Sequence, residues 1–294
     1  MAEVGEGDTV TDAAEASVWE APAKLNFSLE VRPPDRSGYH PVRSLCQTIE
    51  HVDLLTIGTG EDERLVVEGF GVSDGEDNLV WKAARCLVGR PDRPRLDMHL
   101  AKRIPPAAGL GGGSADAAGA LLGVARLFGR DAAEVARCAI EVGSDVPYFL
   151  RGGSMWMEGR GEILTEVEPL TGFAVAVAVP EIAIPTAAAY ARWDELGAPS
   201  GPDLPQRRLP PSLRSLHPLR NDLTPAALSL EPALGDWAAD LAQTWGTAVA
   251  MTGSGSAHFA FFPDVEEAAE AARNLADVRS AFAATLRGTG STSR

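Results

Sequence analysis

The stretch RIPPAAGLGGGSADAAGAL, residues 103–121, constrains the fold of this chain more than any other segment. It follows RLDMHLAKRI, whose apolar residues alternate with polar ones, a pattern that predicts a strand with one buried face. It leads into an alanine-rich segment that predicts a helix over 114–128, with Ser114 as the N-cap and Gly129 as the stop. A strand, a glycine-rich loop and a helix in this order exclude a flexible linker.

The glycine-rich loop is suited to binding an anion. Glycines allow an anion to approach several backbone N–H groups, and the start of a helix adds partial positive charge. No lysine follows Gly113, as a P-loop requires, and Ser114 replaces the last glycine of a dinucleotide fingerprint. The Ser114 hydroxyl could reach a phosphate or its magnesium ion. The alternative is a packing loop whose glycines only let the helix approach a sheet.

Composition limits the other partners of the chain. Its 294 residues suggest two domains, and a net charge of −15 with a pI near 4.8 argues against a nucleic-acid partner. No apolar run is long enough to span a membrane, so we expect no membrane partner. The first twenty residues are acidic, unlike a signal peptide, which predicts a cytoplasmic protein. Residues 1–16 have few large apolar side chains and predict a disordered tail.

Three cysteines, Cys46, Cys86 and Cys138, lack the close spacing of a zinc site or of a disulfide framework. We therefore expect three free cysteines that act as small buried hydrophobic residues in a reducing compartment.

The N-terminal half otherwise alternates strands and helices. LNFSLEV predicts a strand with one buried face, which places Lys24 and Asn26 together on the polar face. A turn-rich loop over 32–41 follows. DNLVWKAARCLVGR predicts a helix with an Asp-Asn cap, and the spacing of Asp131 and Glu134 predicts a capping box. GSDVPYFL predicts a turn that leads into strand-like sequence.

The second half begins near residues 165–172, before the buried strand FAVAVAVP. Six prolines between residues 198 and 218 predict a loop. Beyond it the pattern predicts helical sequence broken at Pro232, two strands joined by the Gly-Ser turn 253–256, and an amphipathic helix in DVEEAAEAARNLADV. The Gly-Ser turn is either a hairpin turn or a second anion site.

The segment PPAAGLGGGSADAA resembles the central motif of the GHMP kinases, the superfamily that includes galactokinase, homoserine kinase and mevalonate kinase. Further resembling blocks occur in order over residues 21–262: APAKLNFSLEV, DRSGYHPVRSLCQTIEHVDLL, DNLVWKAA, GSDVPYFLRGGSMWMEGRGEIL, IAIPTAAAY and MTGSGSAHFAFF. They are most similar to blocks of the members that phosphorylate the 2-hydroxyl of a cytidine-diphosphate methylerythritol on the non-mevalonate isoprenoid route.

The resemblance implies an α+β, two-domain GHMP kinase fold. Residues 17–167 would form an N-terminal domain similar to ribosomal protein S5 domain 2, and residues 168–294 a ferredoxin-like C-terminal domain. ATP and the small-molecule acceptor would lie in the cleft between the two domains. The acidic tail, the 198–218 segment and the last residues depart from the family pattern. Oligomeric state is not indicated.

The resemblance also implies roles for the motif residues. Lys24 and Asp145 would be catalytic. Without the resemblance, Lys24 would be interpreted as a solvated surface lysine and Asp145 as a turn or cap residue. ATP, with Mg²⁺, would bind the loop formed by Pro105, Pro106, Ala107, Ala108, Gly109, Leu110, Gly111, Gly112, Gly113, Ser114 and Ala115. No carboxylate is assigned to the metal ion.

The acceptor would contact Asn26, Tyr39, His40 and Tyr190, with the two tyrosines stacking on the cytosine and the histidine bonding its edge. Taken alone, Tyr39 could equally be a tucked side chain that anchors its loop. Two rival functions remain at this stage: a GHMP kinase for a smaller acceptor such as homoserine or mevalonate, and an inactive relative that only binds a small ligand.

Overall fold

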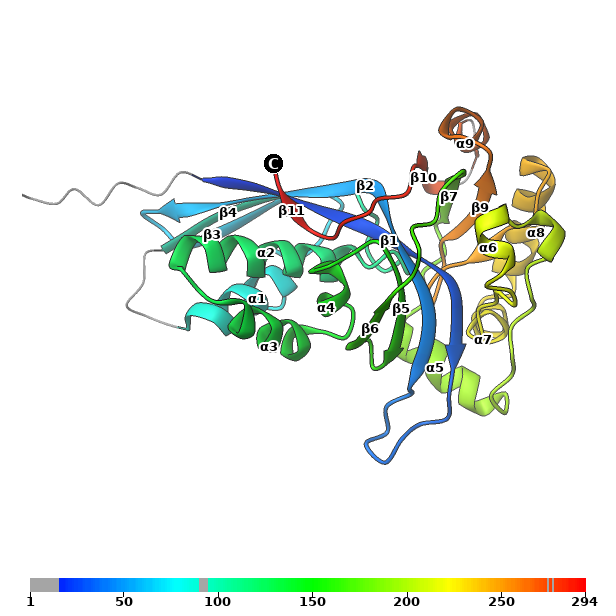
Figure 1. Ribbon diagram of the computed structural model, residues 1–294, viewed down its shortest axis with the longest axis horizontal. Helices are drawn as coiled ribbons and strands as arrows, with labels where there is room; N and C mark the ends of the chain where they lie inside the picture. Colours follow the sequence, from blue (N-terminus) through cyan, green and yellow to red (C-terminus); the bar gives the residue numbers. More distant parts are fainter. Residues whose placement is uncertain (1–15, 90–94, 274, 277) are drawn as a thin grey trace, which may run out of the picture.

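The computed structural model of the chain describes residues 16–89, 95–273, 275–276 and 278–294, and two β-sheets organise these residues (Figure 1). The predicted tail, residues 1–16, lies outside the described residues apart from residue 16. No helix in the described ranges has the length and apolar character needed to cross a membrane.

The first sheet gathers the N-terminal strands and the last strand of the chain. Among the described residues it has seven strands, in the order β11-β1-β2-β4-β3, with β5 pairing with β2 and β6 pairing with β5. Only the β3–β4 pair is parallel among its described pairings, because α1 crosses between these two strands. The strands are β1 (Ser17–Val31), β2 (Val42–Gly60), β3 (Arg64–Gly69), β4 (Arg95–Lys102), β5 (Ser154–Gly159), β6 (Ile163–Glu166) and β11 (Thr292–Ser293).

Four helices lie on one face of this sheet: α1 (Leu79–Val88), α2 (Gly112–Phe128), α3 (Ala132–Val142) and α4 (Val146–Phe149) (Figure 1). The small side chains of α2 let it approach the sheet closely. A Cβ atom on Gly123 would lie 2.4 Å from Ile57 Cδ1 and 2.7 Å from Trp19 Nε1. The small side chains of α2 are therefore required by its packing against the sheet. This close packing places the N-terminus of the helix near the end of β4.

The second sheet is antiparallel and has the order β10-β7-β9-β8 in the described part of the chain. Every residue of β7 is buried, as its continuous apolar run predicts, because α8 and α9 cover one face and β1 residues reach the other. The elements are β7 (Ala174–Pro180), β8 (Ala250–Met251), β9 (His258–Phe262), β10 (Val278–Ala284), α5 (Thr186–Glu195), α6 (Pro211–Arg214), α7 (Thr224–Leu230), α8 (Ala233–Trp245) and α9 (Val265–Ala272).

The two sheets pack against a common hydrophobic core, and β1 of the first sheet contributes to it. Phe27 of β1 packs between Phe173, Phe259 and Phe261 of the second half. The backbone of Leu29 exchanges hydrogen bonds with residues 220 and 222. At the C-terminus, β11 pairs with β1 (Figure 1). The division predicted near residue 167 stays a prediction, but β1 clearly serves both halves.

Most predicted elements are confirmed, and the exceptions have local causes. Helix α2 begins at Gly112 with Gly111 as the N-cap, so the prediction of Ser114 as the cap is wrong. Gly111 adopts φ 73°, a left-handed conformation that glycine tolerates. The VPYF segment forms α4 rather than entering a strand, since Pro147 fits the first turn of a helix.

Two further expectations are corrected by packing. The face of β1 that carries Lys24 and Asn26 is buried, not polar and open, because the glycine-rich loop covers it. The proline-rich 198–218 segment is not wholly irregular: it contains α6 and a short 3₁₀ turn (Gln206–Arg208). It also buries Leu204, Leu209 and Leu213 in the core that the sheets share.

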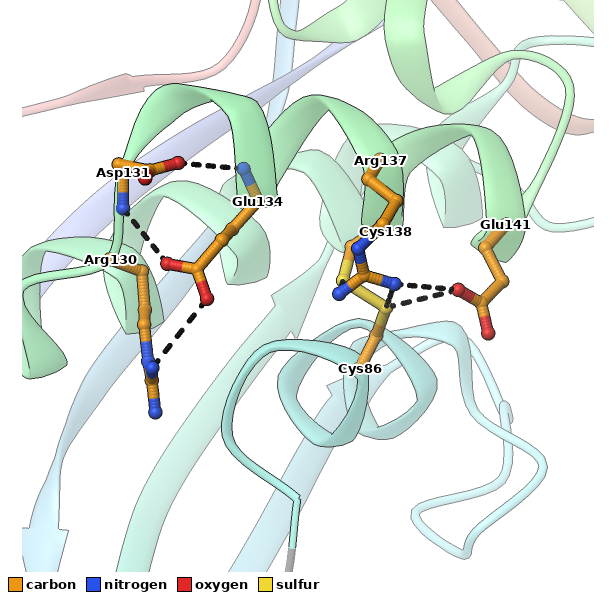
Figure 2. The surroundings of a disulfide bond; sticks show 7 residues. All are labelled: Cys86, Arg130, Asp131, Glu134, Arg137, Cys138 and Glu141. Carbon is orange, nitrogen blue, oxygen red and sulfur yellow. Dashed lines mark hydrogen bonds and ion pairs between the residues drawn. A yellow bond between two sulfur atoms is a disulfide. The ribbon is translucent and has the colours of Figure 1, made fainter.

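Cys86 and Cys138 form a disulfide bond, so the prediction of three free cysteines is wrong for these two (Figure 2). The bond joins α1 to α3, and the Arg137–Glu141 ion pair lies beside it (Figure 2). The two cysteines are separated by 52 residues in sequence, and only the packing of α1 on α3 brings them together. Cys46 is free and buried, as expected, and burial raises the pKa of its thiol to about 11.

Reduction of this disulfide should lower the free energy of unfolding by about 2–4 kcal/mol, because the cross-link restricts the unfolded chain. Urea denaturation with and without dithiothreitol measures the change. The double variant Cys86→Ala/Cys138→Ala should show one midpoint under both conditions. A parent protein whose midpoint is unchanged after complete reduction, verified by thiol alkylation, would contradict this expectation.

Candidate active site

A cavity of about 570 Å³ lies between the two halves and collects most of the predicted site residues. Its walls come from separate parts of the chain: β1, the 32–41 loop, the glycine-rich loop with the start of α2, the residues before α4, the start of α5 and the 253–256 turn. The lining residues are Lys24, Asn26, Leu29, Tyr39, Val42, Leu79, Pro105, Pro106, Ala107, Ala108, Gly109, Leu110, Gly111, Gly112, Gly113, Ser114, Ser144, Asp145, Met157, Arg160, Thr186, Tyr190, Gly253 and Ser254.

The glycine-rich loop carries its helix N-terminus into this cavity. The backbone N–H groups of the first turn of an α-helix have no partner within the helix, so those at the start of α2 are available to an anion. Ser114 lies in this first turn, and it lines the cavity. The loop is held from β1, where the Lys24 N–H donates to the Leu110 carbonyl at 2.9 Å.

The same loop packs backbone to backbone against the 252–255 turn of the second half. A Cβ atom on Gly109 would lie 2.3 Å from the Thr252 carbonyl oxygen, and one on Gly253 would lie 2.9 Å from the Gly109 Cα. Both glycines also have positive φ. The Gly-Ser turn is thus the turn between β8 and β9, and its residues Gly253 and Ser254 also face the cavity.

Lys24 and Asp145 come together in the cavity. The Lys24 Nζ lies 3.7 Å from an Asp145 carboxylate oxygen and donates a hydrogen bond to the Asn26 side-chain oxygen. The Asn26 amide in turn donates to Ser44 Oγ at 2.6 Å. Asp145 precedes α4 but makes no side-chain capping bond, so its carboxylate is available to a ligand. This chain of bonds orients a buried cation beside a carboxylate that is about one-third exposed.

Tyr39 and Tyr190 both line the cavity. The Tyr39 hydroxyl and Ser144 Oγ share a hydrogen bond of 2.7 Å, which ties the 32–41 loop to the segment before Asp145. Burial raises the pKa of the Tyr190 hydroxyl, which therefore stays protonated at neutral pH.

Two predicted residues do not reach the cavity wall. His40 lies behind it, where its ring nitrogen Nε2 is 3.0 Å from the Asp194 carboxylate and its ring contacts Tyr190 at 5.1 Å. Ala115 is fully buried in α2. In this arrangement the His40 ring packs against Tyr190, and the Nε2 atom of His40 is already bound to the Asp194 carboxylate.

Sequence reasoning missed several residues of the wall. Arg160, in the turn between β5 and β6, places its guanidinium 4.8 Å from the centre of the Tyr39 ring. Thr186, a second missed residue, hydrogen-bonds at 2.9 Å to Ser254 of the Gly-Ser turn that the sequence had offered as a possible anion site. The Gly-Arg-Gly sequence at 159–161 was the available signal for Arg160, but only strand pairing brings this turn beside the 32–41 loop.

The described residues contain no group of three or more His, Cys, Asp or Glu side chains that could hold a metal ion by themselves. Asp145 and the Ser114 hydroxyl are oxygen donors in the cavity wall. Mg²⁺ commonly keeps several waters and binds one or two protein oxygens together with substrate phosphates, so this sparse donor set is compatible with it.

A helix N-terminus that is open to an anion and lies in the same cavity as a lysine–carboxylate pair is the arrangement expected of a small-molecule phosphotransferase. The chain matches the GHMP kinases N terminal domain over residues 78–153 and the GHMP kinases C terminal domain over residues 207–281. GHMP kinases are ATP-dependent phosphotransferases, and this chain has their predicted two-domain α+β fold.

Individual relatives show which of the GHMP kinases this chain is similar to. A 4-diphosphocytidyl-2-C-methyl-D-erythritol kinase of Anaeromyxobacter sp. (strain Fw109-5) is 43% identical over 87% of this chain and 86% of its own length. The enzyme of that name from Geobacter sulfurreducens is 36% identical over 91% of this chain and 97% of its own length. A crystal structure of 4-(cytidine 5'-diphospho)-2C-methyl-D-erythritol kinase superposes with a TM-score of 0.76, at 32% identity, over 92% of this chain and 99% of that one. The chain belongs to the 4-diphosphocytidyl-2-C-methyl-D-erythritol kinase family.

The contact between the glycine-rich loop and the 252–255 turn gives a stability prediction. Gly109→Ala should lower the free energy of unfolding by about 2–4 kcal/mol, because the new Cβ meets the Thr252 carbonyl at a positive φ. Gly113→Ala is the matched control: its Cβ would lie 3.6 Å from Leu79 Cδ1, and alanine favours a helix, so we expect a change within about 1 kcal/mol. Thermal unfolding of both variants measures the difference, and equal melting temperatures would contradict the prediction.

Proposed function

We propose that this protein transfers the γ-phosphoryl group of ATP to the 2-hydroxyl of 4-diphosphocytidyl-2-C-methyl-D-erythritol, a step of the non-mevalonate route to isoprenoid precursors. One observation carries the proposal: a single cavity joins a helix N-terminus suited to nucleotide phosphates, the Lys24–Asp145 pair and two tyrosines suited to a nucleobase. The identity to kinases with this printed name supports the same acceptor.

Asp145 is the proposed general base. Its carboxylate accepts the proton of the acceptor's C2 hydroxyl as the hydroxyl oxygen bonds to the γ-phosphorus, while the bond from that phosphorus to the bridging oxygen breaks and ADP leaves. The partial exposure of Asp145 and its freedom from capping leave its carboxylate accessible from the cavity.

Lys24 is the proposed electrostatic partner. A buried ammonium stabilises negative charge on the attacking oxygen and on the phosphoryl group, and a low-dielectric site strengthens this effect. Asn26 and Ser44 fix the direction of the Lys24 side chain through two successive hydrogen bonds. Asn26 is thus suited to orienting Lys24 as well as to contacting the acceptor.

The loop 105–114 and the start of α2 are the proposed phosphate cradle. We propose that the Ser114 hydroxyl is an oxygen ligand for Mg²⁺, which when bound would neutralise phosphate charge. The protein's own contribution is a set of N–H groups that need not reorganise during transfer.

Tyr39 and Tyr190 are the proposed clamp for the cytosine ring, and His40 supports Tyr190 from behind. Homoserine and mevalonate carry no nucleobase and have no use for two such rings. We propose that the reaction takes place in the cytoplasm on a free metabolite; the net charge of −15 does not favour nucleic acid as a partner.

Asp145→Asn should reduce kcat by about 100-fold or more, because the amide cannot accept the hydroxyl proton. ADP release in a coupled assay, with the cytidine-diphosphate methylerythritol as acceptor, measures it. Asp240→Asn, an exposed residue of α8, makes the same chemical change as a control. Nearly full turnover by Asp145→Asn would exclude the proposed base. Turnover of homoserine or mevalonate in place of the cytidine compound would exclude the proposed acceptor.

Tyr190→Ala should raise the KM of the acceptor about tenfold, since a base stacked on an aromatic ring gains about 1–3 kcal/mol. Tyr190→Phe retains the ring and should stay close to the parent enzyme. The KM of ATP should remain within about twofold in both variants, because Tyr190 lies on α5 and not on the glycine-rich loop. Equal rises in both KM values would indicate a general structural effect instead of a base clamp.

A further inference from the structure

A second cavity, of about 250 Å³, lies mainly among elements of the second half and has no lining residue in common with the candidate active site. Its walls come from β1, the 202–205 part of the proline-rich segment, residues 220 and 221, α7, α8, the residues that lead into β8, β8 itself and β9. We call this cavity the α7–α8 pocket. No step of the proposed reaction uses it.

The wall of the α7–α8 pocket is mainly apolar, with side chains that include Phe27, Leu204 and Leu228. Helix α8 contributes only Gly235 and Ala238, whose small size leaves the space between α7 and α8 unfilled. An apolar cavity of about 150 Å³ can bind benzene. The α7–α8 pocket therefore has room for a ring system of about ten non-hydrogen atoms.

One histidine, His258 of β9, lines the pocket although it is only 3% exposed. Its Nδ1 atom lies 3.0 Å from the Ser256 carbonyl oxygen. A carbonyl oxygen can only accept a hydrogen bond, so Nδ1 carries the proton and Nε2 carries a lone pair. Burial lowers the pKa of His258 to about 4, so the ring is neutral at pH 7.

The Nε2 atom of His258 has no hydrogen-bond partner among the described residues. It is accessible from the pocket and not sealed in the core. The ring contacts Trp237 of α8 edge to face, with the ring centres 5.4 Å apart, and this contact holds its orientation. A buried acceptor without a partner is unfavourable, so Nε2 is the point at which the pocket can bind a hydrogen-bond donor.

The charged residues of the wall are Arg220 and Asp203, and they lie close to each other. One Arg220 nitrogen is 3.8 Å from the Asp203 carboxylate, and its Nε donates to Asp222 at 3.1 Å. Asn221 uses its side-chain amide and carbonyl groups within the protein. The Thr224 hydroxyl can either donate or accept. The pocket therefore suits a neutral molecule better than an ion.

We propose that the α7–α8 pocket binds a neutral, mainly apolar molecule of about ten non-hydrogen atoms that donates one N–H or O–H hydrogen bond to His258 Nε2. Met251 and His258 face each other across β8 and β9, at the base of the turn that meets the glycine-rich loop, and both line the pocket. An occupant thus contacts the base of this turn from the side opposite the candidate active site. The inference does not depend on the proposed reaction.

Two isomers, 3-methylindole and 1-methylindole, test the role of His258. They have the same atoms and nearly the same size, but only 3-methylindole has an N–H donor. The parent protein should bind 3-methylindole about tenfold more tightly than 1-methylindole. His258→Phe keeps a ring against Trp237 but has no acceptor, so the two isomers should bind to it within about twofold of each other. Chemical-shift titrations of the ¹⁵N-labelled protein measure the dissociation constants.

A matched histidine variant serves as the control for this comparison. His99→Phe makes the same change on β4, outside the pocket, and should keep the tenfold preference of the parent protein for 3-methylindole.

A second pair of variants tests where the probes bind. Ala238→Phe fills the pocket from α8 and should weaken the binding of both isomers about tenfold or more. Ala239→Phe makes the same change at the next residue, which is exposed and outside the wall, and should leave binding unchanged. Saturating cytidine diphosphate should also leave binding unchanged, because the two cavities have separate walls.

Equal affinity of the parent protein for the two isomers would overturn the inference, as would binding that Ala238→Phe does not weaken. Displacement of the probes by cytidine diphosphate would assign them to the candidate active site and would overturn it too. If His258→Phe does not fold in a thermal melt, the isomer pair on the parent protein and the two alanine variants still decide. Failure of the proposed function is seen separately, as absence of turnover in the coupled assay.

Discussion

The backbone contact between Gly109 and the Thr252 carbonyl is the constraint on which the site depends. It fixes the glycine-rich loop of the first half against a turn of the second half, at a separation that leaves no room for a side chain. On the other side of the loop, β1 bonds to the Leu110 carbonyl and carries Lys24 on the same stretch of strand. The position of the Lys24 ammonium and that of the glycine-rich loop are thus both set by the same stretch of β1 backbone.

The two halves depend on each other, because the polar interactions that complete the site cross between them. Asn221 donates to the carbonyls of Met251 and Gly253 and so shapes the turn that meets the loop. Arg279 of β10 donates to the Pro106 carbonyl. At the far end β11 returns to pair with β1, and Arg287, just before it, forms ion pairs with Glu20 and Glu50. These hydrogen bonds, ion pairs and strand pairings oppose large independent motion of the two sheets. Such rigidity suits a reaction that requires a preorganised site.

Charge is placed locally in a protein that is acidic overall. The cavity wall presents Lys24 near Asp145 and Arg160 beside Tyr39, and Lys102 lies under the first turn of α2. Each of these cations is paired with a carboxylate or held against an aromatic ring, so each is positioned before any substrate arrives. Positive charge is thus concentrated around this cavity although the chain has a net charge of −15.

The sequence by itself determined the order of strand, glycine loop and helix, the capping box of α3, the buried strand β7 and the family, because these features depend on neighbouring residues and on motif blocks. Tertiary structure alone decided the rest. It paired Cys86 with Cys138, moved the start of α2 to Gly112, buried both faces of β1, turned His40 toward Asp194 and joined Lys102 to two carboxylates. The physical reason is that each of these outcomes depends on groups far apart in the chain, whose packing, charge pairing and close backbone approach exist only after the sheets and helices have come together.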